Sequence, residues 1–106
     1  MTINLVHKGL ELTPAITAYV EEKMETLEKF MEGIEQVDVE VGMTTHHHNK
    51  GDVFLCRVNV TVGGELFRVE REEEDLYKAI DKVRDHLRET LAQAKKRRED
   101  KRQSAE

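Results

Sequence analysis

Apolar and polar residues alternate in three stretches of the chain, at residues 2–8, 36–43 and 53–62. A period of two is typical of a β-strand that buries one face. Gly63 and Gly64 separate the third stretch from a further alternating run, which predicts a two-residue hairpin and a fourth strand. The hairpin is expected to pair Val62 with Glu65, Val60 with Phe67 and Val58 with Val69.

Two other stretches repeat their apolar residues at helical spacing. We expect the first helix to have Thr13 as its N-cap and Pro14 at its first position, and to end at Gly33. The second should begin within residues 73–75, where acidic side chains favour a helix N-terminus. The first apolar stripe is Ile16, Val20, Met24, Leu27 and Phe30 or Met31, and the second is Leu76, Ile80, Val83, Leu87, Leu91 and Ala94.

The order of these elements predicts an α+β fold, β-α-β-β-β-α. Two helices should pack on one face of a four-stranded sheet, as in double-stranded-RNA-binding domains. The pattern shows neither a linker nor an internal repeat, so we expect one domain over residues 1–95. Residues 96–106 are strongly charged and are expected to form a frayed C-terminal tail.

Composition agrees with a small globular domain. The 106 residues are 38% hydrophobic and 37% charged, which suits a thin core. A single cysteine, Cys56, makes no intrachain disulfide and fits a reducing compartment. No signal peptide and no apolar run long enough to span a membrane is evident, so a cytoplasmic location is expected.

Charge is distributed unevenly along the chain. The net charge of −5 argues weakly against nucleic acid as a partner. Residues 1–75, however, carry seven Lys or Arg against sixteen Asp or Glu, whereas residues 76–106 carry ten against six. Acids at the start and bases at the end of the last helix also suit its dipole. The gradient therefore indicates a local positive surface but by itself no function.

Residues that would support catalysis are scarce. Cys56 alternates with core valines, so it is expected to be a buried small hydrophobe, and Ser104, the only serine, lies in the tail. The Gly63-Gly64 pair is too short to cradle a phosphate. His46 and His48 fall on one side of an extended segment, but without a third ligand nearby they are interpreted as polar loop residues. We expect neither an enzyme, nor a cofactor, nor a metal site.

Three segments carry a resemblance to a known family: "ELTPAITAYVEEKMETLEKF", "VDVEVGM" and "DLYKAIDKVRDHLRETLAQAKK". Together they resemble the ribosome hibernation-promoting factor family, also called ribosome-associated inhibitor or sigma-54 modulation protein, in its short form. The most specific parts are residues 13–16 and 75–81. The resemblance implies the fold given above, no enzymatic activity, and occlusion of the small-subunit channel used by messenger and transfer RNA. It leaves open whether the chain helps ribosomes to dimerise or holds single ribosomes idle.

The resemblance also implies the binding residues, because the family contacts ribosomal RNA with bases on its helices. The expected RNA-binding residues are Lys8, Lys23, Lys29 and Lys95 at the family's usual positions, with Lys78, Lys82, Arg84 and Arg88 at neighbouring ones. Positions commonly basic in the family are here Thr17, Thr26, His86, Glu89 and Gln93. The expected partner is the small ribosomal subunit, with no membrane and no DNA, and the chain is expected to be a monomer.

Other interpretations of the same residues stay open. A double-stranded-RNA-binding module shares the strand order, but the acids of "REEEDLYKAID" would repel phosphates at the start of its last helix. An acidic protein-interaction adaptor would use the outer sheet face, and a small enzyme would use some of the acids. The outer face is expected to carry Asp38, Glu40, Arg57, Asn59 and Thr61. Tyr19 and Tyr77 would either stack on the nucleobases of RNA or pack at the helix edges.

Overall fold

The computed structural model describes residues 1–45 and 51–104, and it has the expected order of elements. A short 3-10 helix, η1, follows the first α-helix. The elements are β1 (Thr2–Lys8), α1 (Pro14–Glu25), η1 (Thr26–Lys29), β2 (Ile34–Thr45), β3 (Asp52–Val62), β4 (Glu65–Glu73) and α2 (Leu76–Ser104). The histidines at 46–48, interpreted above as loop residues, lie outside the described residues.

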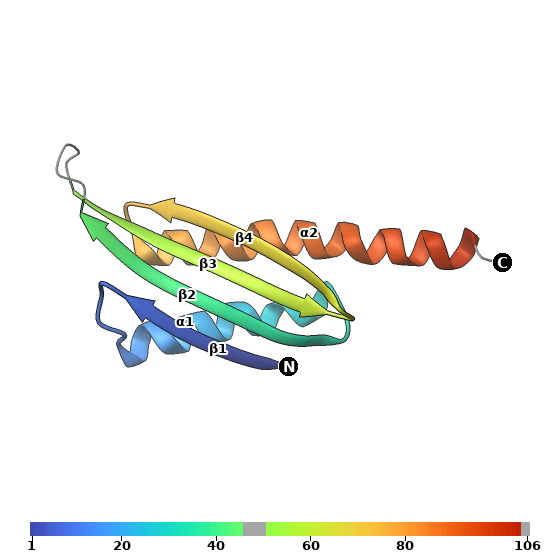
Figure 1. The fold of residues 1–106 in the computed structure, drawn as a ribbon, viewed down its shortest axis with the longest axis horizontal. Helices are drawn as coiled ribbons and strands as arrows, with labels where there is room; N and C mark the ends of the chain where they lie inside the picture. The colour runs from blue at the N-terminus through green and yellow to red at the C-terminus, as the bar shows by residue number, and fades with distance from the viewer. Residues whose placement is uncertain (46–50, 105–106) are drawn as a thin grey trace.

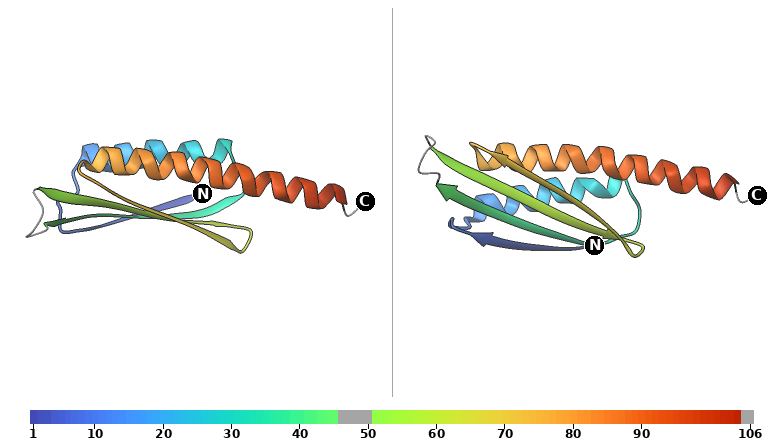
Figure 2. Two further views of the ribbon diagram at one scale, coloured as in Figure 1. Left: turned by 90° about the horizontal axis from the view of Figure 1, so that it is seen from above. Right: turned by 45° about the horizontal axis from the view of Figure 1, so that its top comes forward.

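The four strands form one sheet in the order β1-β2-β3-β4. β1 runs parallel to β2, and the other neighbours are antiparallel. The hairpin between β3 and β4 has the predicted register, with Val62 opposite Glu65 and Val60 opposite Phe67. Both helices cover the same face of the sheet, and α2 extends past its end (Figures 1 and 2). The predicted α+β fold is therefore confirmed.

The core lies between the helices and the inner face of the sheet. β2 contributes Val37, Val39 and Val41, and β3 contributes Cys56 and its neighbouring valines, all at most 2% exposed. The helices contribute Val20, Met24, Leu27, Ile80, Val83, Leu87 and Leu91, which are fully buried. Burial raises the pKa of the Cys56 thiol to about 12, so its nucleophilic thiolate is suppressed. This agrees with its interpretation as a small hydrophobe.

The first helix begins as predicted but ends early. Thr13 caps it, because its Oγ1 atom accepts a hydrogen bond from the Ile16 amide at 3.2 Å. The expectation of a helix continuing to Gly33 was wrong, since α1 ends at Glu25. The Thr26 hydroxyl donates to the Lys23 carbonyl at 2.6 Å, a local bond that competes with helical pairing. The tighter turns of η1 still bury Leu27, which explains why the apolar spacing resembled one continuous helix.

The last helix is capped by Asp75, whose Oδ1 atom accepts a hydrogen bond from the Tyr77 amide at 2.8 Å. At its other end α2 is helical as far as Ser104. The fraying expected of residues 96–106 stays a prediction. Arg98 attaches this last part to the hairpin. Its Nη2 atom lies 3.2 Å from the Val62 carbonyl oxygen and 3.0 Å from Glu65 Oε1. A long-range contact therefore holds part of the segment that was expected, from its charge alone, to be a tail.

Candidate nucleic-acid interface

The two α-helices meet along a line that begins at a pair of tyrosines. The rings of Tyr19 and Tyr77 lie 4.8 Å apart in an edge-to-face arrangement. The Tyr19 hydroxyl donates to Asp81 Oδ1 at 2.5 Å, and this bond is the largest cause that raises the Tyr19 pKa to about 12. Tyr19 therefore joins α1 to α2. Tyr77 keeps 40% of its surface exposed, so the contact with Tyr19 covers its side chain only in part.

Lys23 belongs to the same cluster. Its Nζ atom lies 3.6 Å from Asp81 Oδ1 and 5.2 Å from the centre of the Tyr19 ring. The lysine thus balances the Asp81 carboxylate, and its side chain is only 26% exposed. An RNA phosphate would have to compete with Asp81 for this ammonium group. Among the three predicted lysines that form an ion pair in the described part of the chain, Lys23, Lys78 and Lys82, the side chain of Lys23 is the least exposed.

The two arginines of the predicted site differ in whether a carboxylate is paired with them. The Nε atom of Arg84 lies 3.1 Å from Asp85 Oδ1, an ion pair that lacks hydrogen-bond geometry. The guanidinium of Arg88 lies 6.0 Å from the centre of the Phe30 ring, at the limit of a cation–π contact. Arg88 is exposed, so it can offer a planar pair of donors to phosphate oxygens.

A positive hollow lies beyond Arg88, where η1 meets the later turns of α2. Lys29, Lys95 and Lys96 line it, together with Glu99. None of these three lysines forms an ion pair with another described residue. The fold therefore brings Lys29, from one end of the first helical segment, beside two lysines more than sixty positions further along the chain. The hollow has three ammonium groups against one carboxylate.

The remaining predicted bases of α2 are already paired. The Lys82 ammonium lies 2.5 Å from Glu73 Oε1, and this contact is the largest cause that lowers the Glu73 pKa. The Lys78 ammonium lies 4.0 Å from Glu74, one turn earlier. Because Glu73 offsets Lys82 and Glu74 partly offsets Lys78, we do not expect these two lysines to attract phosphates as strongly as the unpaired lysines.

Lys8 stands apart from the helix bases. It is the last residue of β1, the edge strand, and it lies opposite Gly42 of β2. The last residues of β1 lie on the side of the molecule where α1 and α2 begin, far from the last turns of α2 (Figure 1). The structure therefore brings together Lys29, Arg88 and Lys95 of the predicted site, and it does not bring Lys8 to them.

Two bases on the helix side of the sheet were missed by the sequence interpretation, one on α2 and one on β4. Lys96 was assigned to the tail, although the run of bases starting at Lys95 was a signal for it. Arg71 has the same strand parity as Phe67 and Val69, which places it on the face of β4 that α2 covers. That parity was the signal that could have identified it.

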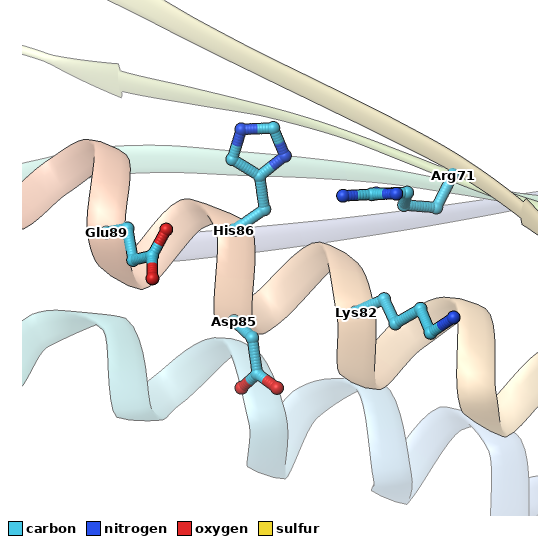
Figure 3. Close-up of a pocket in the computed structure, with 5 residues that line it drawn as sticks. All are labelled: Arg71, Lys82, Asp85, His86 and Glu89. Carbon is cyan, nitrogen blue, oxygen red and sulfur yellow. The ribbon is translucent and has the colours of Figure 1, made fainter.

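Figure 3 shows the hollow that Arg71 forms with α2. The Arg71 side chain reaches from β4 toward His86, and Lys82 extends along the helix away from Glu89 (Figure 3). Asp85 points to the opposite side of α2 from His86 (Figure 3). With Asp85, Glu89 and the neighbouring Glu73, three carboxylates lie here against the two bases Arg71 and Lys82. This flank of α2 is consequently less positive than the hollow around Lys29.

The outer face of the sheet is occupied by polar contacts among its own strands. Arg57 pairs with Glu70 at 2.6 Å and with Glu40 at 3.1 Å. Asn4 and Gln36 donate to Asp38, and these bonds lower the pKa of its carboxyl. The acids expected to serve an adaptor surface are thus largely paired within the domain.

Neither metal chemistry nor a membrane span is indicated by the described parts of the chain. No group of three or more His, Cys, Asp or Glu side chains within residues 1–45 and 51–104 is arranged to hold a metal ion. None of the helices described there is long and apolar enough to cross a bilayer. The arrangement that remains is a mixed sheet covered by two helices, with unpaired bases gathered at one end of the helix layer.

Comparison with known proteins identifies the family of this α+β domain. The family described as sigma 54 modulation protein / S30EA ribosomal protein matches residues 3–99. The chain therefore belongs to that family, as its sequence resemblance implied. A ribosome hibernation promotion factor of Deinococcus radiodurans is 32% identical over 91 residues, covering 85% of this chain and 47% of that protein. The chain spans about half the length of the first curated relatives that it matches.

Other relatives match over nearly their whole length. A ribosome hibernation promoting factor of Klebsiella oxytoca is 30% identical over 97 residues, covering 90% of this chain and 94% of that protein. The crystal structure of the N-terminal domain of Thermus thermophilus Protein Y superposes with a TM-score of 0.74 at 30% identity, covering 88% of this chain and 98% of that one. A ribosomal subunit interface protein of Coxiella burnetii shares the fold, with a TM-score of 0.72 at 22% identity, over 90% and 98%.

Proposed function

We propose that this chain is a ribosome hibernation factor that binds the small subunit in the channel for messenger and transfer RNA. The family match over residues 3–99, with hibernation factors among the relatives, is the observation that carries the proposal. The domain would act as a cytoplasmic monomer, catalyse no reaction, and block the channel by occupying it. Residues 1–95 would supply the ribosome-binding domain, with the later turns of α2 adding bases to it.

The ion pairs of the helix layer support a choice among the predicted RNA-binding residues. Lys29, Lys95 and Lys96 have no carboxylate partner among the described residues, and Arg88 is exposed beside them. Unpaired ammonium and guanidinium groups bind phosphates with the release of counterions, which supplies most of the affinity of such surfaces. We therefore propose this group as the principal RNA contact. Lys8, Lys23, Lys78, Lys82 and Arg84 would contribute less, because they are paired or distant.

Cosedimentation through a sucrose gradient tests the proposal. The purified chain is added to vacant ribosomes and, in parallel, to separated small and large subunits. We expect it to migrate with whole ribosomes and small subunits, and to be displaced when messenger and transfer RNA are bound first. A chain that stays at the top of every gradient at low salt would contradict the proposal. The same gradients report whether ribosomes dimerise or remain single.

The second candidate is an RNA-binding or acidic adaptor domain that does not act on ribosomes. It would draw on the excess of acids in residues 1–75, but the outer-face carboxylates of Asp38, Glu40 and Glu70 already have partners within the domain. Salt distinguishes the candidates. Binding through phosphates weakens steeply as salt rises, whereas apolar docking to a protein does not.

A further inference from the structure

An apolar groove lies at the end of the molecule opposite the unpaired lysines. Leu10, Ile16, Phe54, Leu76 and Tyr77 line it, and its volume is about 500 Å³. These residues come from the loop before α1, the first turn of α1, the start of β3 and the first turn of α2. Figure 1 shows that α1 and α2 both begin at this end. The groove is therefore formed by segments that are distant in the sequence.

The side chains in the groove are incompletely covered. Leu10, Ile16 and Phe54 are only partly buried, and Tyr77 is 40% exposed. Leu76 is nearly buried and forms part of the floor. A concave, mainly apolar surface on a small domain marks a place where another apolar group can be buried. The opening is large enough to admit one bulky side chain.

Three carboxylates surround the opening: Glu11, Glu74 and Asp75. Asp75 is engaged in capping α2, with its Oδ1 atom 2.8 Å from the Tyr77 amide nitrogen. Glu74 has an 85% exposed side chain and reaches Lys78 only at 4.0 Å. Glu11 is exposed and forms no ion pair within the described parts of the chain. Within that part of the chain Glu11 thus stands unpaired beside the groove before α1, and Glu74, before α2, is exposed and held only by the 4.0 Å pair with Lys78.

We propose that this groove binds a basic peptide segment of another protein. A bulky apolar side chain of that segment would enter between Leu10 and Tyr77, and Lys or Arg residues next to it would pair with Glu11 and Glu74. Charge complementarity selects this occupant, since no base lines the groove. An acidic segment or a nucleic acid would be repelled by the same carboxylates, and Asp75 already takes the Tyr77 amide that an anion would seek.

A second copy of the chain fits the groove poorly. Its basic C-terminal stretch, residues 95–104, contains no bulky apolar residue. The last such residue before it is Leu91, which is fully buried in the core of its own domain. A partner must supply both the bases and the apolar anchor from one exposed segment. The groove therefore points to another protein with a basic tail or loop.

Binding of synthetic peptides to the intact chain tests this proposal without ribosomes. The probe is a labelled peptide with a Leu-Phe centre and two lysines on each side. Two matched peptides carry Ala-Ala at the centre or glutamates at the flanks. Fluorescence anisotropy measures affinity, and amide shifts of the isotopically labelled protein locate the site. We expect amide shifts confined to residues 10–16, 54 and 74–77. We expect the affinity for either matched peptide to be lower by about tenfold or more.

Matched charge variants complete the test. Glu11→Lys with Glu74→Lys should weaken the basic peptide by about tenfold or more. Glu21→Lys with Glu25→Lys, which makes the same change in net charge on exposed positions of α1, should leave affinity within about twofold. Circular dichroism must show both variants folded.

Several results would overturn the proposal. Equal binding of the Ala-Ala peptide would mean that only charge is recognised, and equal loss in both charge variants would mean that only net charge matters. Shifts in the groove that grow with protein concentration alone would assign it to a second copy. None of these results bears on the ribosome gradients, so the two proposals fail or stand separately.

Discussion

The hydroxyl of Tyr19 shows how one polar atom contributes to holding the helix layer together. It donates to Asp81 across the line between α1 and α2, and the pKa of Tyr19 is raised to about 12. Replacing Tyr19 by phenylalanine keeps the ring and removes only the hydrogen bond to Asp81. We expect Tyr19→Phe to lower the free energy of unfolding by about 0.5–1.5 kcal/mol at neutral pH, as measured by urea denaturation.

The pH dependence of that loss has a definite sign. Because the folded pKa of Tyr19 exceeds its ordinary value of 10.0, the neutral hydroxyl stabilises the fold below pH 10, and this contribution disappears as pH rises toward about 12. The difference between the parent and Tyr19→Phe should therefore shrink across that interval. Tyr77→Phe is the control, since the Tyr77 hydroxyl makes no hydrogen bond in the described part of the chain. A constant difference between parent and variant up to pH 12 would contradict this role.

Single residues also show where sequence interpretation stopped. The bases of both helices could be named from the sequence, but their charge partners could not. Lys82 meets Glu73 across the turn between β4 and α2, and Lys23 meets Asp81 across two helices. Neither pairing has a sequence period, because each depends on how separate elements pack. The sequence thus predicted candidate bases without indicating which of them stay free to bind a phosphate.

Elements were predicted more completely than contacts. Period-two alternation and the Gly63-Gly64 turn were sufficient for the register of β3 and β4, since the turn length determines the pairing. The end of α1 was missed because η1 keeps Leu27 facing the core. The Arg98 contacts with Val62 and Glu65 could not be predicted, because they join segments that are distant in the sequence.

The attachment of α2 to the hairpin can be tested at the level of the element. We expect Arg98→Ala to lower the free energy of unfolding by about 1 kcal/mol, since the lost bonds are partly exposed. Amide hydrogen exchange in residues 95–104 should accelerate at the same time. Arg97→Ala, at an exposed position of the same turn, should change neither quantity by a comparable amount. Unchanged exchange in the Arg98 variant would show that the helix end persists without this side chain.

Over the whole molecule, the unpaired lysines Lys29, Lys95 and Lys96 and the apolar groove lie toward opposite ends of a long, narrow shape. The principal extents are 58 × 28 × 18 Å, and α2 runs along the longest of them (Figure 1). Acids surround the start of α2, and unpaired bases lie near its later turns. In a site that offers phosphates, this separation would orient the domain with its basic end toward RNA and its acidic end away from it.

Salt dependence of ribosome binding separates the free bases from the paired ones. Changing Lys29, Lys95 and Lys96 together to alanine should weaken binding and flatten its salt dependence by about 0.7–0.9 log units in slope for each lost phosphate contact. Changing Lys78 and Lys82 to alanine should flatten it less per residue, because their carboxylate partners already offset them. Filter binding or gradient sedimentation over a range of salt concentrations measures both slopes.

Both sets of variants must first be shown to be folded by circular dichroism, since bases near the end of α2 also stabilise the helix through its dipole. A slope that changes equally per residue in the two sets would mean that the carboxylates release Lys78 and Lys82 when RNA arrives. A slope unchanged by the triple substitution would move the RNA contact away from the hollow between η1 and α2. Arg71 and Lys82, on the side of α2 where Arg71 reaches from β4 toward His86, would then be the next candidates for the RNA contact (Figure 3).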